Sequence, residues 1–321
     1  MYTVYGFERN PFSQQHSINA AYFFANEGYD IKYNAEFANI FNKWNFLLET
    51  EYTSPNYTIN YFGLGNKTEN YEEDFGDHYH RVRLSTYSAS PSLKWRGRMG
   101  GQFKVGGTIE SIEVEKTENR FINIIDYVLD ERKTYLGPKV SYAYENYDNK
   151  ALPTLGMSVF LETGWMSNVD NKKENYSFIT PSLSFTHKIT SNGKVVLATK
   201  LKGNIIIGDN FEFYNAASIG GIDGLRGYRN QRFTGNKSFY QNTDLRFNLR
   251  KVKTELIPLQ IGLFGGFDYG RVWLDEEKSE DWKTSYGAGF WLVGAEMINL
   301  NLSVFNSIDG AYVRFGLGFG F

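Results

Sequence analysis

Hydrophobic and polar residues alternate along most of this chain, and a period of two residues is typical of β-strands with one apolar and one polar face. Residues 298–306 show it clearly, with isoleucine, leucine and valine on one face and asparagine and serine on the other. No apolar run approaches the ~18 residues that a membrane-spanning helix requires, which excludes a helical membrane protein. With 26 Phe and 23 Tyr, the chain is also rich in the aromatic residues that membrane β-barrels use. The sequence therefore predicts an all-β protein.

Connection lengths distinguish a soluble β-sandwich from a transmembrane β-barrel, because only the barrel has reason to sort short turns and long loops to opposite ends. The tight connections are 26–28, 54–56, 97–100, 192–193, 251–255 and 294–296, and the long ones include 64–78, 115–130, 207–237 and 274–281. About sixteen segments have the length to cross a bilayer at a tilt. They are 1–8, 15–25, 30–40, 44–54, 56–63, 79–96, 101–114, 131–146, 153–166, 174–189, 194–206, 238–250, 256–273, 282–293, 297–306 and 310–321.

This pattern predicts a 16-stranded antiparallel transmembrane β-barrel that occupies residues 1–321 as a single domain. Its expected location is the bacterial outer membrane, with the long loops extracellular and the short turns periplasmic. Residues 1–12 lack the basic start and apolar core of a signal peptide. We therefore expect a signal peptide, and any N-terminal periplasmic or enzymatic domain, to be absent from this chain.

The last predicted strand alternates to its final residue, and its terminal aromatic residues Phe319 and Phe321 resemble the signal by which outer-membrane proteins are recognised for insertion. Its other face carries Gly316, Gly318 and Gly320. Because glycine within a strand costs stability and often marks close approach of another backbone, we expect something to pack inside the lumen near this face. The alternative is that these glycines permit sharp curvature of the barrel.

The connection 207–237 is the candidate to fill the lumen, because its closely spaced glycines allow it to fold sharply and to approach a wall. Inside a barrel, Arg226 would require a carboxylate partner, since an unpaired buried charge is costly. By strand parity, Asp268 and Asp244 both face inward and are the two candidates. If the loop lies outside instead, Arg226 is a solvated surface residue.

Two short motifs resemble those of the BamA/TamA-like superfamily, also called bacterial surface antigen barrels. The first is the loop run Gly224, Leu225, Arg226, Gly227 and Tyr228. The second, an aromatic residue, Asp, any residue and Gly on the thirteenth predicted strand, matches Phe267, Asp268 and Gly270. The resemblance implies that the loop folds into the lumen, that Arg226 contacts Asp268, and that the first and last strands meet at a seam that can open sideways.

The resemblance also implies a function, namely insertion or translocation of a polypeptide or lipid client across or into the outer membrane. Outer-membrane lipid and lipopolysaccharide are then the expected surroundings. Residues 61–68 are similar to a stretch found in barrels fused to patatin-like phospholipases or metallophosphoesterases, so a membrane anchor for a missing hydrolase domain is the alternative. A passive porin-like channel is a weaker alternative, because a plugged lumen conducts poorly. The sequence leaves the client and the oligomeric state open.

No motif for nucleophilic, metal-dependent or phosphate-binding catalysis occurs, so we assign no catalytic residue and expect no enzymatic activity in this chain. The absence of cysteine rules out disulfides and thiolate metal sites. His78 and His80 lie among acidic residues, where we favour a solvated loop over a metal site. We expect no metal and no cofactor. A net charge of −2 gives no reason to expect nucleic acid as a partner.

Overall fold

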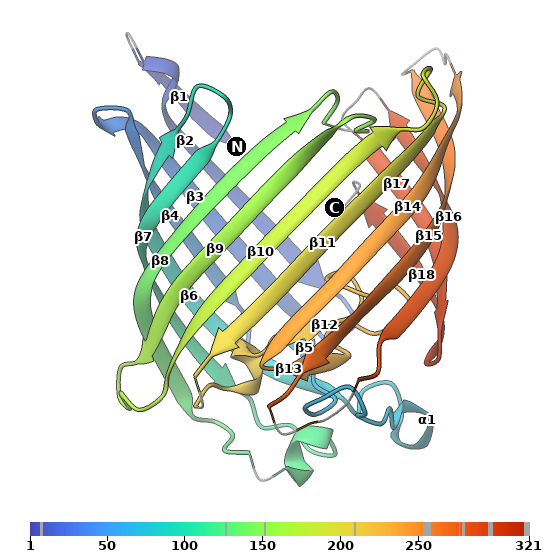
Figure 1. Ribbon diagram of the computed structural model, residues 1–321. Coiled ribbons are helices and arrows are strands. Elements are labelled where there is room, and N and C mark those ends of the chain that lie inside the picture. The colour runs from blue at the N-terminus through green and yellow to red at the C-terminus, as the bar shows by residue number, and fades with distance from the viewer. Residues whose placement is uncertain are drawn as a thin grey trace.

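The computed structural model describes residues 1–6, 9–125, 127–150, 152–208, 210–252, 258–275, 277, 280–294 and 298–317. Sixteen strands belong to one antiparallel sheet, which curls into a barrel (Figure 1). They are β1 (Tyr2–Gly6), β2 (Arg9–Phe23), β3 (Gly28–Phe41), β4 (Trp44–Thr53), β5 (Thr58–Asn60), β6 (Arg81–Arg96), β7 (Gln102–Val114), β8 (Arg132–Tyr147), β9 (Gly156–Asn168), β10 (Asn175–Lys188), β11 (Val195–Ile207), β14 (Lys237–Val252), β15 (Leu259–Trp273), β16 (Lys283–Gly294), β17 (Ile298–Ser307) and β18 (Gly310–Leu317).

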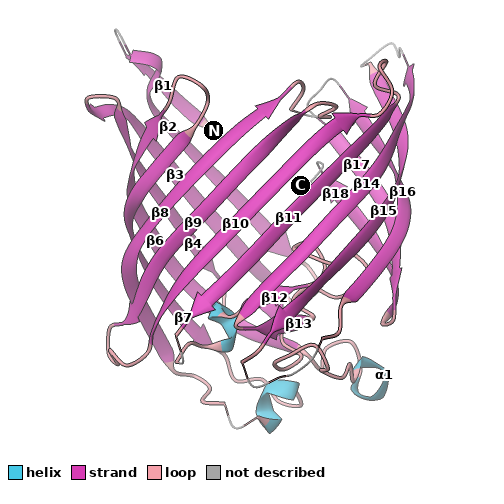
Figure 2. Ribbon diagram, in the orientation of Figure 1, coloured by secondary structure: helices cyan, strands magenta, loops and turns pink. Residues whose placement is uncertain are grey.

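The remaining elements are short and lie toward one end of the barrel (Figure 2). They are the two-stranded sheet of β12 (Ala217–Ile219) and β13 (Phe233–Gly235), the helix α1 (Glu72–Phe75), and the 3-10 turns η1 (Phe121–Ile124) and η2 (Phe213–Asn215). Among the described residues, no helix has the length and apolar character needed to cross a membrane.

The all-β class and the sixteen-stranded antiparallel sheet are confirmed, and each of the sixteen predicted segments overlaps one strand. The expectation that 56–63 crosses the membrane is wrong, because that segment supplies only the three residues of β5, which pair with β6 away from the main strand order. The chain then leaves the wall at Gly63 and Gly65, whose φ values of 97° and 104° are readily adopted only by glycine.

The long loops gather at one end of the barrel, the lower end in Figure 1, and short turns join the strands at the other end. Two tight connections that we had grouped with the short turns, 26–28 and 54–56, lie at the long-loop end instead. There the Asn26 side-chain amide donates to Thr58 Oγ1 at 2.8 Å, and the Ser54 N–H donates to the Tyr29 carbonyl at 2.9 Å. The end at which a connection lies is set by the parity of the strands before it, so a short connection can lie at either end.

The strand register places apolar side chains on the outer wall and polar ones on the lumenal wall. On β7, Ile109 is 41% exposed on the outside and pairs with Leu136 of β8, whereas Thr108 faces the lumen and accepts a hydrogen bond from Ser90 at 2.7 Å. An apolar outside and a polar inside are the arrangement of a transmembrane barrel and the reverse of a soluble one.

These adjacent residues allow a direct test of the two faces. We predict that Ile109→Arg, near the middle of β7, lowers the free energy of unfolding in a bilayer by roughly 2–4 kcal/mol, because it puts a charge against lipid tails. Thr108→Arg, which adds the same side chain to the polar lumen, should cost less than about 1 kcal/mol. Urea titration of both variants folded into phospholipid vesicles measures the difference, and equal costs would contradict the assigned faces.

Candidate functional site

The connection 207–237, named here the lumenal loop, turns back on itself within the barrel. Its base is closed by β12 and β13, which pair from Ala217 with Gly235 to Ile219 with Phe233. Its tip turns at Gly220, Gly221 and Gly224, with φ values of 133°, 70° and 141°. A Cβ on Gly221 would lie 1.8 Å from Asn230 Oδ1, so this position requires glycine for both its backbone angle and its space.

An apolar cluster attaches the loop to the inner wall. Leu225 and Tyr228 are almost completely buried, and Tyr240 of β14 and Val272 of β15 reach them from the wall. The cluster consists of Ile219, Leu225, Tyr228, Phe233, Tyr240 and Val272. The aliphatic and aromatic residues of the loop motif therefore supply packing, and they leave the arginine between them to make polar contacts.

Arg226 lies between two wall carboxylates and one ring. Its guanidinium contacts Asp268 at 2.6 Å and Asp244 at 2.8 Å, and its backbone N–H also donates to Asp268 at 2.9 Å. The Asp268 side chain is 0% exposed. The ring of Phe305 lies 4.1 Å from the guanidinium carbon, a cation–π distance. Both carboxylates that sequence parity offered as alternative partners are thus in contact with the same arginine.

The final strands hold the neighbouring backbone of the loop. Ser285 on β16 donates to Asp268 at 2.9 Å and accepts from the Gly227 N–H at 3.1 Å. Arg314 on β18 donates from Nε to the Arg226 carbonyl at 3.0 Å and from Nη2 to the Tyr228 carbonyl. No sequence motif singled out Ser285 or Arg314. The sequence shows only that both are polar residues at inward-facing positions, and many other residues share that property, so it does not single them out as contacts of the loop.

The glycines of the wall make room for these side chains. A Cβ on Gly266 would lie 2.7 Å from Arg226 Nη2 and 2.8 Å from Asp244 Oδ1. At Gly270 the nearest side chain is Tyr240, which belongs to the wall, and at Gly316 it is Asn301. Of these three glycines, only Gly266 has an atom of the loop among its nearest neighbours. The other positions make room for side chains of adjacent strands.

The predicted partners on β15 divide between the two faces. Asp268 and Gly270 face the lumen, whereas Phe267 is 48% exposed on the outer wall and lies away from the loop. Parity alone separates these neighbours, because successive residues of a strand point to opposite sides. Gly318, Gly320, Phe319 and Phe321 lie outside the described residues.

A second set of ion pairs holds the loop at the long-loop end. Arg229 pairs with Glu72 of α1 at 3.0 Å, and Arg232 pairs with Asp309 at 2.6 Å. Arg232 also donates to the Thr68 hydroxyl at 2.7 Å and to the Thr68 carbonyl at 2.8 Å. Residues 61–80, which we name the cap segment, therefore cover the loop at the long-loop end of the barrel.

His80 in the cap segment is fully buried, so the expectation of a solvated loop is wrong at this residue, although His78 is exposed. Its ring stacks on Phe62 at 4.1 Å, its Nε2 accepts from the Tyr71 N–H at 3.1 Å, and its Nδ1 lies 3.2 Å from the Tyr61 carbonyl. These contacts fit a neutral ring with the proton on Nδ1. Burial lowers the pKa of His80 to about 4.

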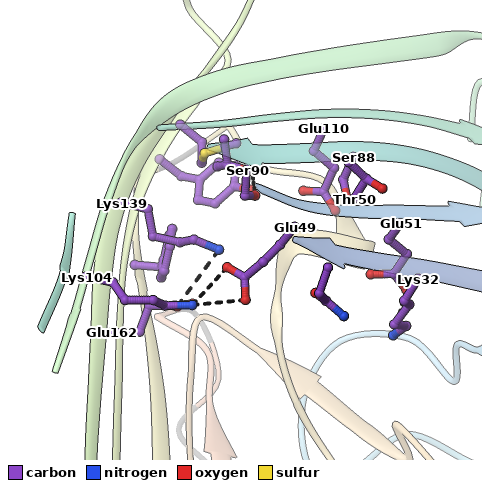
Figure 3. A pocket seen from close by; sticks show the side chains of 15 residues that line it. Lys32, Glu49, Thr50, Glu51, Ser88, Ser90, Lys104, Glu110, Lys139 and Glu162 are labelled. Carbon is purple, nitrogen blue, oxygen red and sulfur yellow. Dashed lines mark hydrogen bonds and ion pairs between the residues drawn. The ribbon is translucent and has the colours of Figure 1, made fainter. Parts of the chain in front are cut away.

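The lumenal wall formed by β3 to β10 is lined differently, by charged and hydroxyl side chains around a cavity of about 450 Å³ (Figure 3). Opposite charges form pairs between strands. Lys32–Glu51 at 2.9 Å and Lys139–Glu162 at 3.9 Å join neighbouring strands, and Lys104–Glu49 at 2.8 Å joins β7 to β4 across β6. Within the part of the chain that the structure describes, no group of three or more His, Asp or Glu side chains is arranged to hold a metal ion.

This fold is that of an integral outer-membrane barrel of the BamA/TamA-like superfamily, as the sequence motifs implied. A family model described as haemolysin secretion/activation protein ShlB/FhaC/HecB matches residues 57–292, and the chain belongs to that family. A search of curated protein sequences finds no match.

Solved structures show the same fold at low sequence identity. BamA from Haemophilus ducreyi lacking POTRA domains 1–3 has a TM-score of 0.64 and 14% identity over 90% of this chain and 61% of that one. CdiB from Acinetobacter baumannii has a TM-score of 0.61 and 12% identity, with 95% of this chain and 53% of that one covered. CdiB from Escherichia coli has a TM-score of 0.55 and 13% identity, with 94% and 58% covered. This chain thus spans little more than half the length of these proteins.

The contacts of Arg226 that hold the lumenal loop lead to a prediction about the free energy of unfolding. Arg226→Ala should lower the free energy of unfolding by about 3–5 kcal/mol, because it leaves Asp268 and Asp244 buried without their partner. Denaturant titration of the vesicle-embedded barrel measures this. A variant that unfolds like the parent would show that the ion pairs add nothing to stability.

Two adjacent glycines on β15 supply a matched control for the same site. Gly266→Ala should cost about 1–3 kcal/mol, because its methyl group collides with Arg226 and Asp244. Gly265→Ala should change stability by less than about 0.5 kcal/mol, since the nearest atom to its Cβ lies 4.0 Å away on the outer wall.

The buried His80 predicts a dependence of the cap segment on pH. Because its pKa is lowered on folding, its contribution is complete above the unfolded-state pKa of about 6.5 and is lost as the pH falls from there toward 4. Hydrogen exchange of residues 61–80, corrected for intrinsic rates, should therefore rise between pH 7 and pH 4.5. His80→Gln should remove this rise, and an unchanged rise in that variant would assign it to other groups.

Proposed function

We propose that this barrel translocates an extended polypeptide across the outer membrane through its lumen, with the lumenal loop as a gate that must move aside. The description of its family as haemolysin secretion/activation proteins supports a secretion role. The relevant structural observation is that the lumenal wall has two parts of different character. The wall of β14 to β18 is occupied by the lumenal loop, and the wall of β3 to β10 is polar and lines an open cavity.

The polar wall suits a passing chain because most of its charges are paired. Lys104 with Glu49 and Lys32 with Glu51 leave little net charge to attract an unfolded segment strongly. The side chains lining this cavity are mostly polar, so few apolar surfaces would retain a hydrophobic side chain. An unfolded polypeptide would meet many weak polar contacts, which allow movement along the pore.

The loop has the contacts expected of a gate that can be released. Its base packs in apolar clusters, and beyond these the loop is held by ion pairs and hydrogen bonds to Asp268, Asp244, Glu72 and Asp309. Water can replace such contacts when the loop moves into a hydrated lumen, whereas it cannot replace apolar packing. Release of Arg226 therefore costs less than the number of its contacts suggests.

Crosslinking the loop tests the gate. The chain has no native cysteine, so in an Arg226→Cys, Asp268→Cys variant a short, cleavable bis-thiosulfonate crosslinker reacts only with this pair. In planar bilayers, the crosslinked barrel should conduct weakly, and cleavage by a reductant should produce larger openings. Equal conductance before and after cleavage would show that the loop does not gate the lumen.

A polypeptide probe separates this function from the alternatives. After cleavage, an unfolded synthetic polypeptide added on the short-turn side should interrupt the current transiently. Steady current without such interruptions would favour a passive channel. The absence of current in both states would favour either a membrane anchor for a further domain or insertion of clients through the seam between the first and last strands.

A further inference from the structure

One carboxylate in the polar cavity of the β3 to β10 wall has no cation of its own. Three lysines and four glutamates line that cavity, so its lining carries an excess of negative charge. Each lysine pairs with one glutamate, and the acid that remains is Glu110 of β7. Among the residues that the structure describes, the Glu110 carboxylate makes no ion pair and no hydrogen bond.

The strand register places Glu110 in a row of inward side chains. It shares the parity of Thr108, and it pairs with Ser88 of β6, which in turn pairs with Glu51 of β4. Figure 3 shows Glu110, Ser88 and Glu51 in this order along the wall of the cavity. Since neighbouring strands are about 4.8 Å apart, the backbones of the two glutamates are roughly 10 Å apart, with one small side chain between them. The serine therefore leaves a space between two carboxylates.

Aromatic side chains enclose Glu110 on its other side. Glu110 pairs with Tyr135 of β8, which is fully buried, and Tyr176 of β10 lines the same cavity. The Tyr135 hydroxyl donates to Glu174 at 3.5 Å, so it does not serve Glu110. Glu110 is thus enclosed by protein atoms and opens toward the cavity. Because such a carboxylate is poorly hydrated, a cation that reaches it is attracted more strongly than at an open surface.

The other charges that act on Glu110 leave it uncompensated. Glu51 is a like charge, and it already pairs with Lys32 at 2.9 Å. Lys139 of β8 is an opposite charge, but it pairs with Glu162 at 3.9 Å. Lys139 also faces a position on β7 that is four residues, or roughly 13 Å, away from Glu110. The space between the two glutamates is therefore a negative site within a wall that is otherwise paired.

We propose that Glu110 and Glu51, with the Ser88 hydroxyl between them, bind the ammonium or guanidinium group of a basic side chain in the translocated polypeptide. This proposal rests on the translocation function proposed above. A lysine or arginine carries its charge on a long flexible stem, so it reaches the two carboxylates while its backbone stays in the lumen. A metal ion fits less well, because no three His, Asp or Glu side chains gather among the described residues. A passing chain would therefore pause at its basic residues.

A thiol placed between the two carboxylates tests the site directly. Because the chain has no cysteine, Ser88→Cys supplies the only thiol, and its rates of modification by aminoethyl and sulfonatoethyl methanethiosulfonate are compared in the folded barrel. Relative to a small thiol in solution, the ratio of the two rates should favour the cationic reagent. Adding Glu110→Gln should lower this ratio about fivefold, because one nearby charge is lost.

The matched control is Glu145→Gln in the same Ser88→Cys chain. Glu145 also faces inward, but it lies on β8 ten residues, or roughly 30 Å, beyond the partner of Glu110, where its charge is screened. This control should leave the ratio unchanged, and the heat-dependent shift in gel mobility shows that each variant is folded. An unchanged ratio in the Glu110→Gln variant, or a thiol that reacts with neither reagent, would overturn the proposal.

Two synthetic polypeptides test the basic side chain as the ligand. With the crosslink of the Arg226→Cys, Asp268→Cys variant cleaved, an unfolded polypeptide that contains lysines should interrupt the current for longer than one with glutamines in their place. Glu110→Gln should remove most of this difference, and Glu145→Gln should preserve it. Equal interruptions by the two polypeptides would overturn the proposal. If neither polypeptide interrupts the current, the proposed translocation fails, and the ratio of thiol rates still decides whether the site attracts organic cations.

Discussion

The contact of Arg226 with Asp268 and Asp244 is the interaction on which the interior of this barrel depends. One guanidinium joins carboxylates from β15 and β14, and the Phe305 ring of β17 covers it. Asp244 also lies 3.9 Å from Arg246, so two arginines balance two aspartates at the wall. If the loop were withdrawn, the two carboxylates would lose their partner and would have to be hydrated, which makes the inserted loop the stable arrangement.

This contact of Arg226 with the two aspartates also determines which residues the surrounding wall can accommodate. Side chains at Gly266 would collide with the guanidinium, and Gly227 of the loop lies so close to Ser285 that a Cβ there would be 2.7 Å from the serine Cβ. Gly227 of the loop motif and Gly266 of the wall therefore belong to one fitted interface. A glycine that weakens a strand locally is tolerated here because it allows a buried ion pair in exchange.

Most of what could be predicted from the sequence came from the alternation of polar and apolar residues. Alternation located all sixteen strands, and parity placed Asp244 and Asp268 inside, because both signals are local. It did not predict that 56–63 supplies only the three residues of β5 before the cap segment, or that His80 is buried in contact with Phe62 and Tyr71. Contacts such as that of Arg229 with Glu72 join residues far apart in the sequence, and no local sequence pattern predicts them.

Adjacent residues of the same strands serve the two faces of the barrel wall. On β11, Lys202 faces inward and pairs with Asp223 of the loop at 3.0 Å, while the adjacent Gly203 lies on the lipid-facing wall. On β14, Tyr240 donates inward to Asp223 at 3.3 Å, and its neighbour Phe239 lies on the lipid-facing wall. The residues that receive the loop and the residues that face lipid therefore share one backbone, so the position of the loop depends on the same strand register that forms the outer wall.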